Sequence, residues 1–183
     1  IDYPPDYVDK MTAAIDKYDR KVVVCVHGNI LTDRFKDYYD KASRVCLHFR
    51  DGLTQDTEVS IAGAGTAAYH SDGLQLSIAD FNVKYTSDLL LSLAAVRQGC
   101  KIIAIERPAG WLKPLLYKDN IYNTVYNHKD YRQSLNNLCK DLMKAGCVIS
   151  NSNYLNSSVL PQRKIAVIVC AYNMSERDIE LFE

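Results

Sequence analysis

Two side chains in one loop have the chemistry to bind a phosphorylated sugar. Arg107 and Trp111 flank Pro108-Ala109-Gly110, directly after an apolar run at 101–105. A guanidinium can neutralise a diphosphate, and the face of an indole suits stacking on a pyranose ring. The alternative is that the indole only anchors the loop in the core, and the residue types alone leave both interpretations open.

A glycine-rich turn is the second candidate. The run at 58–62 leads into Gly63-Ala64-Gly65-Thr66, where small residues let backbone amides approach a sugar or a phosphate closely. We expect the ligand contacts to come from Gly65 and Thr66. A tight turn between two strands is the simpler alternative. No Walker lysine follows, and the spacing differs from the dinucleotide fingerprint.

An acidic residue, Asp88, lies in the first turn of a helix predicted at 86–98. Thr86 can cap this helix and Gly99 can end it. Apolar residues cover most of its circumference, which predicts a central helix. By itself, an aspartate at this position stabilises the helix through the dipole.

Alternation of strand and helix patterns predicts an α/β protein with a partly parallel sheet. We expect strands at 21–26, 58–62 and 101–105 to share one sheet of a three-layer unit, with helix 86–98 packed on it. Residues 27–29 should form a turn after the first strand, with His27 at its carboxyl end, where ligand sites of α/β proteins lie. The remaining expected elements are a helix containing Val8, Met11, Ile15 and Tyr18, a strand at 45–49 that includes a structural His48, and a helix containing Tyr131, Leu135, Leu138 and Leu142 that Gly146 closes.

The composition is that of an ordinary globular protein. The 183 residues are 48% hydrophobic and 24% charged, and 22 basic residues balance 22 acidic ones. This balance argues against a nucleic acid partner. No run is long enough to span a bilayer, and no signal peptide is evident. Six cysteines lie in apolar runs without a Cys-x-x-Cys pair, which predicts buried, reduced thiols in a cytosolic protein.

Several motifs, in order, resemble bacterial family-2 glycosyltransferases of the GT-A fold. They are Ile1-Asp-Tyr-Pro-Pro-Asp-Tyr7, Val24-Cys-Val-His-Gly28, Gly63-Ala-Gly-Thr-Ala-Ala-Tyr-His70, Ala79-Asp80-Phe81, Ser87-Asp88 and Ile105-Glu-Arg-Pro-Ala-Gly-Trp111. The resemblance implies a GT-A-like, Rossmann-related mixed sheet, incomplete at its start. It also implies transfer of a sugar from a UDP-linked nucleotide donor to a saccharide acceptor in surface polysaccharide synthesis.

The same resemblance assigns roles to individual residues. Asp88 takes the place of the general base of an inverting transferase, although this chain has Ser87 where the family often has glutamate. The Asp-x-Asp motif that binds Mg²⁺ or Mn²⁺ would lie just upstream of Ile1, unless Asp2 is its last member. Because some GT-A enzymes add a histidine to this site, His70 and His128 are candidate metal ligands. A sugar contact or turn residue at His70, and a surface residue at His128, are the alternatives.

The chain's end resembles the opening of a second such domain. We expect residues 1–149 to be the acceptor-side half of one domain, residues 150–163 a linker, and residues 164–183 the first strand and helix start of the next. In that second domain Tyr172 and Asn173 would contact the nucleobase. Lacking the upstream motif, this chain alone is expected to have little or no activity.

Two other functions remain open at this stage. One is a non-catalytic α/β binding module, in which all these residues are structural. The other is a nucleotide-dependent methyltransferase, with Glu106 holding a ribose after the turn at Gly63. For the glycosyltransferase we expect a cytoplasmic location, with peripheral membrane association and a homo-oligomeric state as further expectations.

Overall fold

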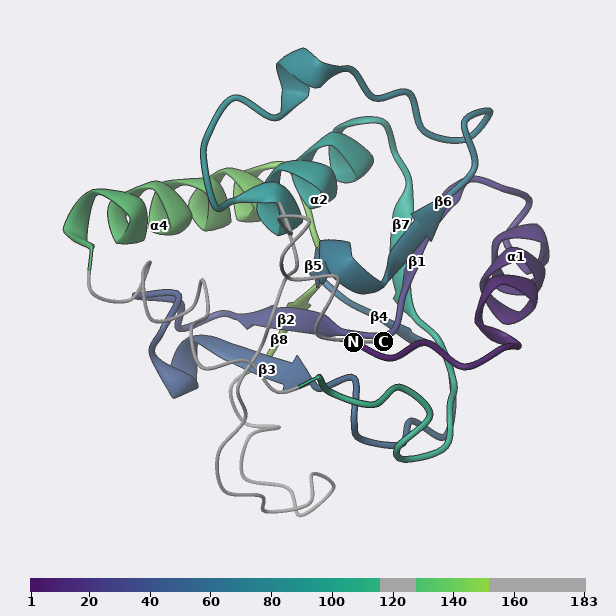
Figure 1. Ribbon diagram of the computed structural model, residues 1–183. Coiled ribbons are helices and arrows are strands. Elements are labelled where there is room, and N and C mark those ends of the chain that lie inside the picture. Colours follow the sequence, from purple (N-terminus) through teal and green to yellow (C-terminus); the bar gives the residue numbers. More distant parts are fainter. Residues whose placement is uncertain (116–127, 152–183) are drawn as a thin grey trace, which may run out of the picture.

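The computed structural model describes residues 1–115 and 128–151, and shows a mixed α/β protein with two mixed sheets (Figure 1). Its helices are α1 (Tyr7–Lys17), α2 (Ser87–Arg97) and α4 (Lys129–Lys144). Its strands are β1 (Val22–Cys25), β2 (Gly28–Thr32), β3 (Arg44–Leu47), β4 (Thr57–Glu58), β5 (Ile61–Ala62), β6 (Ala67–Tyr69), β7 (Lys101–Ala104) and β8 (Ile149–Ser150). Short 3₁₀ turns are η1 (Lys41–Ser43), η2 (Ala64–Thr66) and η3 (Ile78–Asp80).

The first sheet has the strand order β4-β7-β1-β6 and lies between two helices. β1 pairs in parallel with β7, while β6 and β4 are antiparallel to their neighbours. All four residues of β1 are buried, and they alternate between faces. Val23 and Cys25 pack with α2, whereas Val22 and Val24 pack with Met11 of α1. The expected layering of helix, sheet and helix is therefore confirmed for this part of the protein.

The second sheet is built around β2. β3 and β5 pair with it in antiparallel fashion, and β8 pairs with it in parallel. Leu31 of β2 packs beneath Leu89 of α2 and Leu135 of α4. Figure 1 shows α2 and α4 side by side above this sheet. Because α2 touches α4 and both sheets, its prediction as a central helix is confirmed.

One strand prediction and one turn prediction were wrong at the junction between the sheets. The run 58–62 is not one strand, because Thr57–Glu58 pairs with β7 and Ile61–Ala62 pairs with β2. The break falls at Ser60, whose buried hydroxyl accepts the Leu31 N–H and donates to the carbonyl of Val148. Likewise, Gly28 and Asn29 do not form a turn but begin β2. Both chain segments thus cross from one sheet to the other at the same corner.

Of the predictions about the helices, those for the glycines that end them are confirmed, whereas those for Thr86 and Val8 are wrong. Thr86 occupies the N-cap position of α2, yet its hydroxyl donates to the Val83 carbonyl instead of capping the helix. Gly99 and Gly146 follow α2 and α4 with φ of +72° and +89°, as helix-ending glycines do. Val8 was expected on the apolar face of α1 but is 68% exposed.

The chain boundaries and cysteines are described only in part. Ser150, assigned to the linker, is instead part of β8, and the strand expected at 164–170 lies outside the described residues.

Of the cysteines in the described part, four are buried and free, as expected, while Cys46 is exposed. Within residues 1–115 and 128–151, no helix has both the length and the apolar character needed to cross a bilayer.

Candidate functional site

The structure brings the predicted acidic residue to the glycine-rich turn. Asp88, in the first turn of α2, is half-buried, and its Oδ1 accepts the backbone N–H of Ala64 over 2.8 Å. Burial raises the pKa of the Asp88 carboxyl above its usual value, and the Ala64 hydrogen bond opposes this rise. Two candidates that lie apart in the sequence are therefore in direct contact.

Within the turn, Gly65 and Thr66 have different positions. Thr66 is buried, where its hydroxyl accepts the His27 N–H at 2.9 Å and donates to the Gly63 carbonyl at 3.1 Å. These bonds fix the turn against the end of β1. Gly65 is exposed, and a Cβ added there would meet no heavy atom within 4 Å. Of the two residues, only Gly65 offers its backbone to a ligand.

The start of the chain lies against the same turn. The Tyr3 hydroxyl donates to the Gly65 carbonyl, and Asp2 pairs through its backbone with Lys113. The Tyr3 side chain therefore lies beside the turn that holds Asp88.

Arg107 and Trp111 make contacts that favour the structural alternative. The Arg107 guanidinium is buried and donates to the carbonyls of Ile105, at 3.0 Å, and His48, at 3.1 Å. The Trp111 indole N–H donates to the Asp6 carboxylate. The centroid of the Trp111 ring lies 5.6 Å from that of Tyr7, and the Lys10 ammonium lies 4.8 Å from the Trp111 ring. Both side chains fasten the 107–113 loop to its neighbours. Their contacts with a donor stay predictions.

A buried nitrogen cluster was not foreseen as a unit. The rings of His27 and His48 meet edge to face at 5.4 Å, and Arg107 lies beside them. In the described part of the chain, His27 Nδ1, His48 Nε2 and Arg107 Nε have no hydrogen-bond partner. Burial, with the neighbouring cations, lowers the pKa of His27 to about 3; burial and Arg50 lower that of His48 to about 4. The sequence signal was weak: two histidines that each follow a strand.

The proposed metal ligands His70 and His128 have separate surroundings. His70 Nδ1 accepts the Asp72 N–H at 3.1 Å, which fits the turn-residue alternative. The His128 ring stacks at 4.4 Å on Tyr131, at the start of α4. Among residues 1–115 and 128–151, no group of three or more ligating side chains could hold a metal ion. The described residues therefore do not provide a site for Mg²⁺ or Mn²⁺ by themselves.

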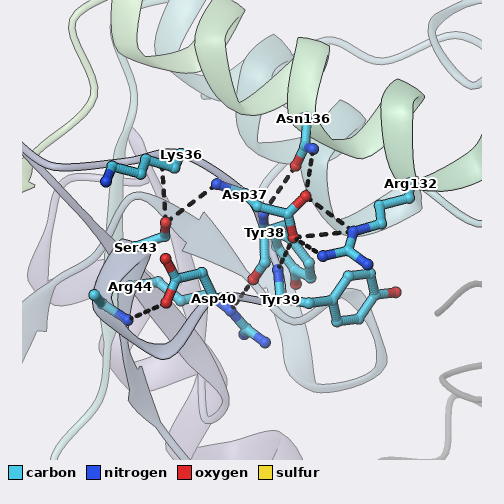
Figure 2. A network of polar contacts seen from close by, with 10 residues as sticks. Lys36, Asp37, Tyr38, Tyr39, Asp40, Ser43, Arg44, Arg132 and Asn136 are labelled. Carbon is cyan, nitrogen blue, oxygen red and sulfur yellow. Dashed lines mark hydrogen bonds and ion pairs between the residues drawn. The ribbon is translucent and has the colours of Figure 1, made fainter.

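Figure 2 shows a polar network that the sequence did not reveal. The Asp37 carboxylate accepts two N–H groups of Arg132, at 2.8 and 2.9 Å, and the amide of Asn136 at 2.7 Å. Asn136 in turn accepts the Tyr38 N–H. Arg132 holds the pKa of the Asp37 carboxyl at about 2, below its usual value. The network fastens the loop before η1 to α4, across 95 residues of sequence.

Fold and site together define an α/β protein with a half-buried carboxylate held against a glycine-rich turn. Neither a scan against protein-family models nor a search of curated protein sequences returns a match to this chain. Tyr172 and Asn173 lie outside the described residues, so their nucleobase contacts stay predictions.

Proposed function

We propose that this chain is the acceptor-side part of an inverting, family-2-like glycosyltransferase of the GT-A fold. The observation that carries the proposal is the contact between Asp88 and the Gly63–Thr66 turn. The donor would be a nucleotide-sugar, UDP-linked by resemblance, and the acceptor a saccharide. The cytoplasmic location, with peripheral association at a membrane, belongs to the same proposal.

In this proposal Asp88 is the general base. The Ala64 N–H orients Oδ1, and within the described part of the chain Oδ2 receives no hydrogen bond. Oδ2 would take the proton of the acceptor hydroxyl as the oxygen attacks the anomeric carbon and the nucleotide diphosphate leaves from the opposite face. The raised pKa of Asp88 brings it closer to the operating pH, which favours proton acceptance.

The divalent metal belongs to the proposal only through the motif expected upstream of Ile1. There Mg²⁺ or Mn²⁺ would offset the charge of the leaving diphosphate. The described residues supply no ligand set, and no role of Asp88 depends on one.

The test uses the protein extended upstream of Ile1 to include the expected acidic motif. Asp88→Asn should lower turnover roughly 100- to 10,000-fold while donor binding changes little. Asp80→Asn is the matched control, because this carboxylate accepts the Ser77 N–H in a capping turn. Near-normal turnover of Asp88→Asn, with turnover lost in the control, would transfer the base role to Asp80. Near-normal turnover of both would show that neither carboxylate is the base, whereas an extended protein that binds the donor but transfers no sugar would be a binding module.

No observation favours the methyltransferase alternative. Gly63–Gly65 leads through η2 into strand β6, not into the α-helix N-terminus that binds a nucleotide in a βα unit. Glu106 lies just beyond the carboxyl end of β7, and its backbone N–H donates to the Asp56 carboxylate.

A further inference from the structure

A hollow of about 310 Å³ opens beside Ala64. It lies between β6, η3 and the middle of α2. Its walls are made of Ala64, Ala67, Tyr69, Leu76, Ser77, Ile78, Phe81 and Leu91. Its volume is within the range of small-molecule sites, which are apolar with few polar groups.

The rim of the hollow exposes large apolar side chains. Ile78 is 91% exposed, Tyr69 40% and Phe81 37%. Ile78 is held in this position by a capping box, because Ser77 and Asp80 on either side of it exchange hydrogen bonds. Clustered, exposed apolar residues of this kind mark interaction sites more often than single ones do.

The chemistry of the walls selects the ligand. Among the described residues, no charged side chain lines the hollow, and Ser77 supplies the one hydroxyl besides that of Tyr69. A phosphate or a diphosphate would find no cation among these described lining residues. The hollow therefore suits an uncharged, apolar group.

The hollow adjoins the candidate base. Ala64, part of its wall, is the residue whose N–H holds Asp88. Leu91, also part of its wall, follows Asp88 by three positions on α2 and so lies on the same helix face. The hollow and the Asp88 carboxylate are thus neighbours that share Ala64.

We propose that the hollow binds an uncharged acyl or aryl substituent carried by the saccharide acceptor, an inference that rests on the proposed function. Tyr69, Ile78 and Phe81 would cover the substituent, while the sugar remains over Asp88 and the Gly65 turn. Specificity would then depend on the substituent as well as on the sugar.

The test compares methyl and p-nitrophenyl glycosides of glucose, galactose and N-acetylglucosamine, titrated into the chain and followed by NMR. At least one p-nitrophenyl glycoside should bind roughly tenfold more tightly than its methyl partner. Ile78→Ser and Phe81→Ser should remove this preference. Val8→Ser, which changes a 68% exposed residue on α1, is the matched control and should retain it.

Equal binding of both glycoside forms, or a preference that survives both substitutions, would overturn the proposal. So would a change in sedimentation mass on Ile78→Ser without a change in preference, because the hollow would then be a contact between copies of the chain. If a p-nitrophenyl glycoside binds more tightly than its methyl partner but the extended protein transfers no sugar, the result counts against the proposed function and not against the hollow. Transfer without the preference counts against the hollow alone.

Discussion

The backbone N–H of Ala64 donates to the carboxylate of Asp88 over 2.8 Å, and so joins a turn to a helix 24 residues further along the chain. The turn is fixed on its other side by Thr66, which is bonded to the end of β1. Asp88 is therefore positioned by the corner where the two sheets meet, not by α2 alone. This arrangement is stiff, and its parts can be perturbed one at a time.

The two glycines of the turn should respond differently to alanine. A Cβ at Gly63 would lie 2.8 Å from His27 Cδ2 and 3.1 Å from the His27 carbonyl, so Gly63→Ala should cost about 1–3 kcal/mol. Gly65→Ala meets open space and should change stability by less than about 0.5 kcal/mol. Urea denaturation of both variants checks this. Equal losses would mean that the turn is not held against His27.

Neutralising Asp88 should not destabilise the protein at neutral pH. The pKa of its carboxyl is raised by burial, so the folded state prefers the protonated form, and this contribution to stability is lost as pH rises through the folded pKa. Asp88→Asn is neutral throughout and can still accept the Ala64 N–H. Its free energy of unfolding, measured from pH 4 to pH 8, should fall less with rising pH than that of the wild type. A large loss at pH 8 would show that Asp88 serves mainly to stabilise α2.

The Asp37 network should matter for stability in a pH-dependent way. Asp37→Asn should cost about 1–3 kcal/mol at pH 7, because it removes a charge-assisted, two-pronged contact with Arg132. The pKa of this carboxyl is lowered from 3.8 to about 2, so the stabilisation is present above pH 4 and is lost as pH falls towards 2.

A matched control for this network is Asp141→Asn. Asp141 and Lys144 form an exposed pair at 3.3 Å on the same helix, which should contribute less than about 0.5 kcal/mol. Chemical denaturation of both variants at pH 7 and pH 3 gives the comparison. Equal losses of stability in the two variants at pH 7 would mean that the Asp37 network stabilises the protein no more than an exposed ion pair does.

Local patterns in the sequence predicted the elements better than their pairing. α2 was predictable because its apolar residues and Gly99 are local signals, and the site residue Asp88 was found with it. The division of run 58–62 between two sheets was not, because it depends on the Ser60 hydroxyl reaching Leu31 and Val148, which are distant in sequence. Val8 fits the helical spacing of α1, yet no element in the described part of the chain covers it.

The same limit applies to the candidate site. Asp37 carries no motif, and only the fold brings Arg132 to it from 95 residues away. Trp111 illustrates the opposite case. Its residue type suggested a sugar contact, which stays a prediction, while the structure shows its indole bonded to Asp6 and lying against Tyr7. A residue type indicates what a side chain can bind, but its neighbours decide which contact forms.

The buried histidines should make the protein sensitive to mild acid. Burial lowers the pKa of His27 from 6.5 to about 3 and that of His48 to about 4, while Arg44 and Arg107 add to the effect on His27. In the unfolded chain both take up protons near pH 6.5, so the unfolded state binds more protons and stability falls as pH drops from about 6.5 towards 4. Each histidine should lower the free energy of unfolding by roughly 1 kcal/mol as the pH falls from 6 to 5.

His27→Phe tests this contribution, because it keeps an aromatic ring among His48 and Phe49 and removes the unpartnered Nδ1. At pH 8, where both histidines are neutral, the difference from the wild type reports packing and the removal of the unpartnered Nδ1. Between pH 6.5 and pH 4.5 the variant should lose less stability than the wild type, as measured by urea denaturation at each pH. Parallel curves for the two proteins would mean that His27 takes up its proton as readily in the folded state as in the unfolded one.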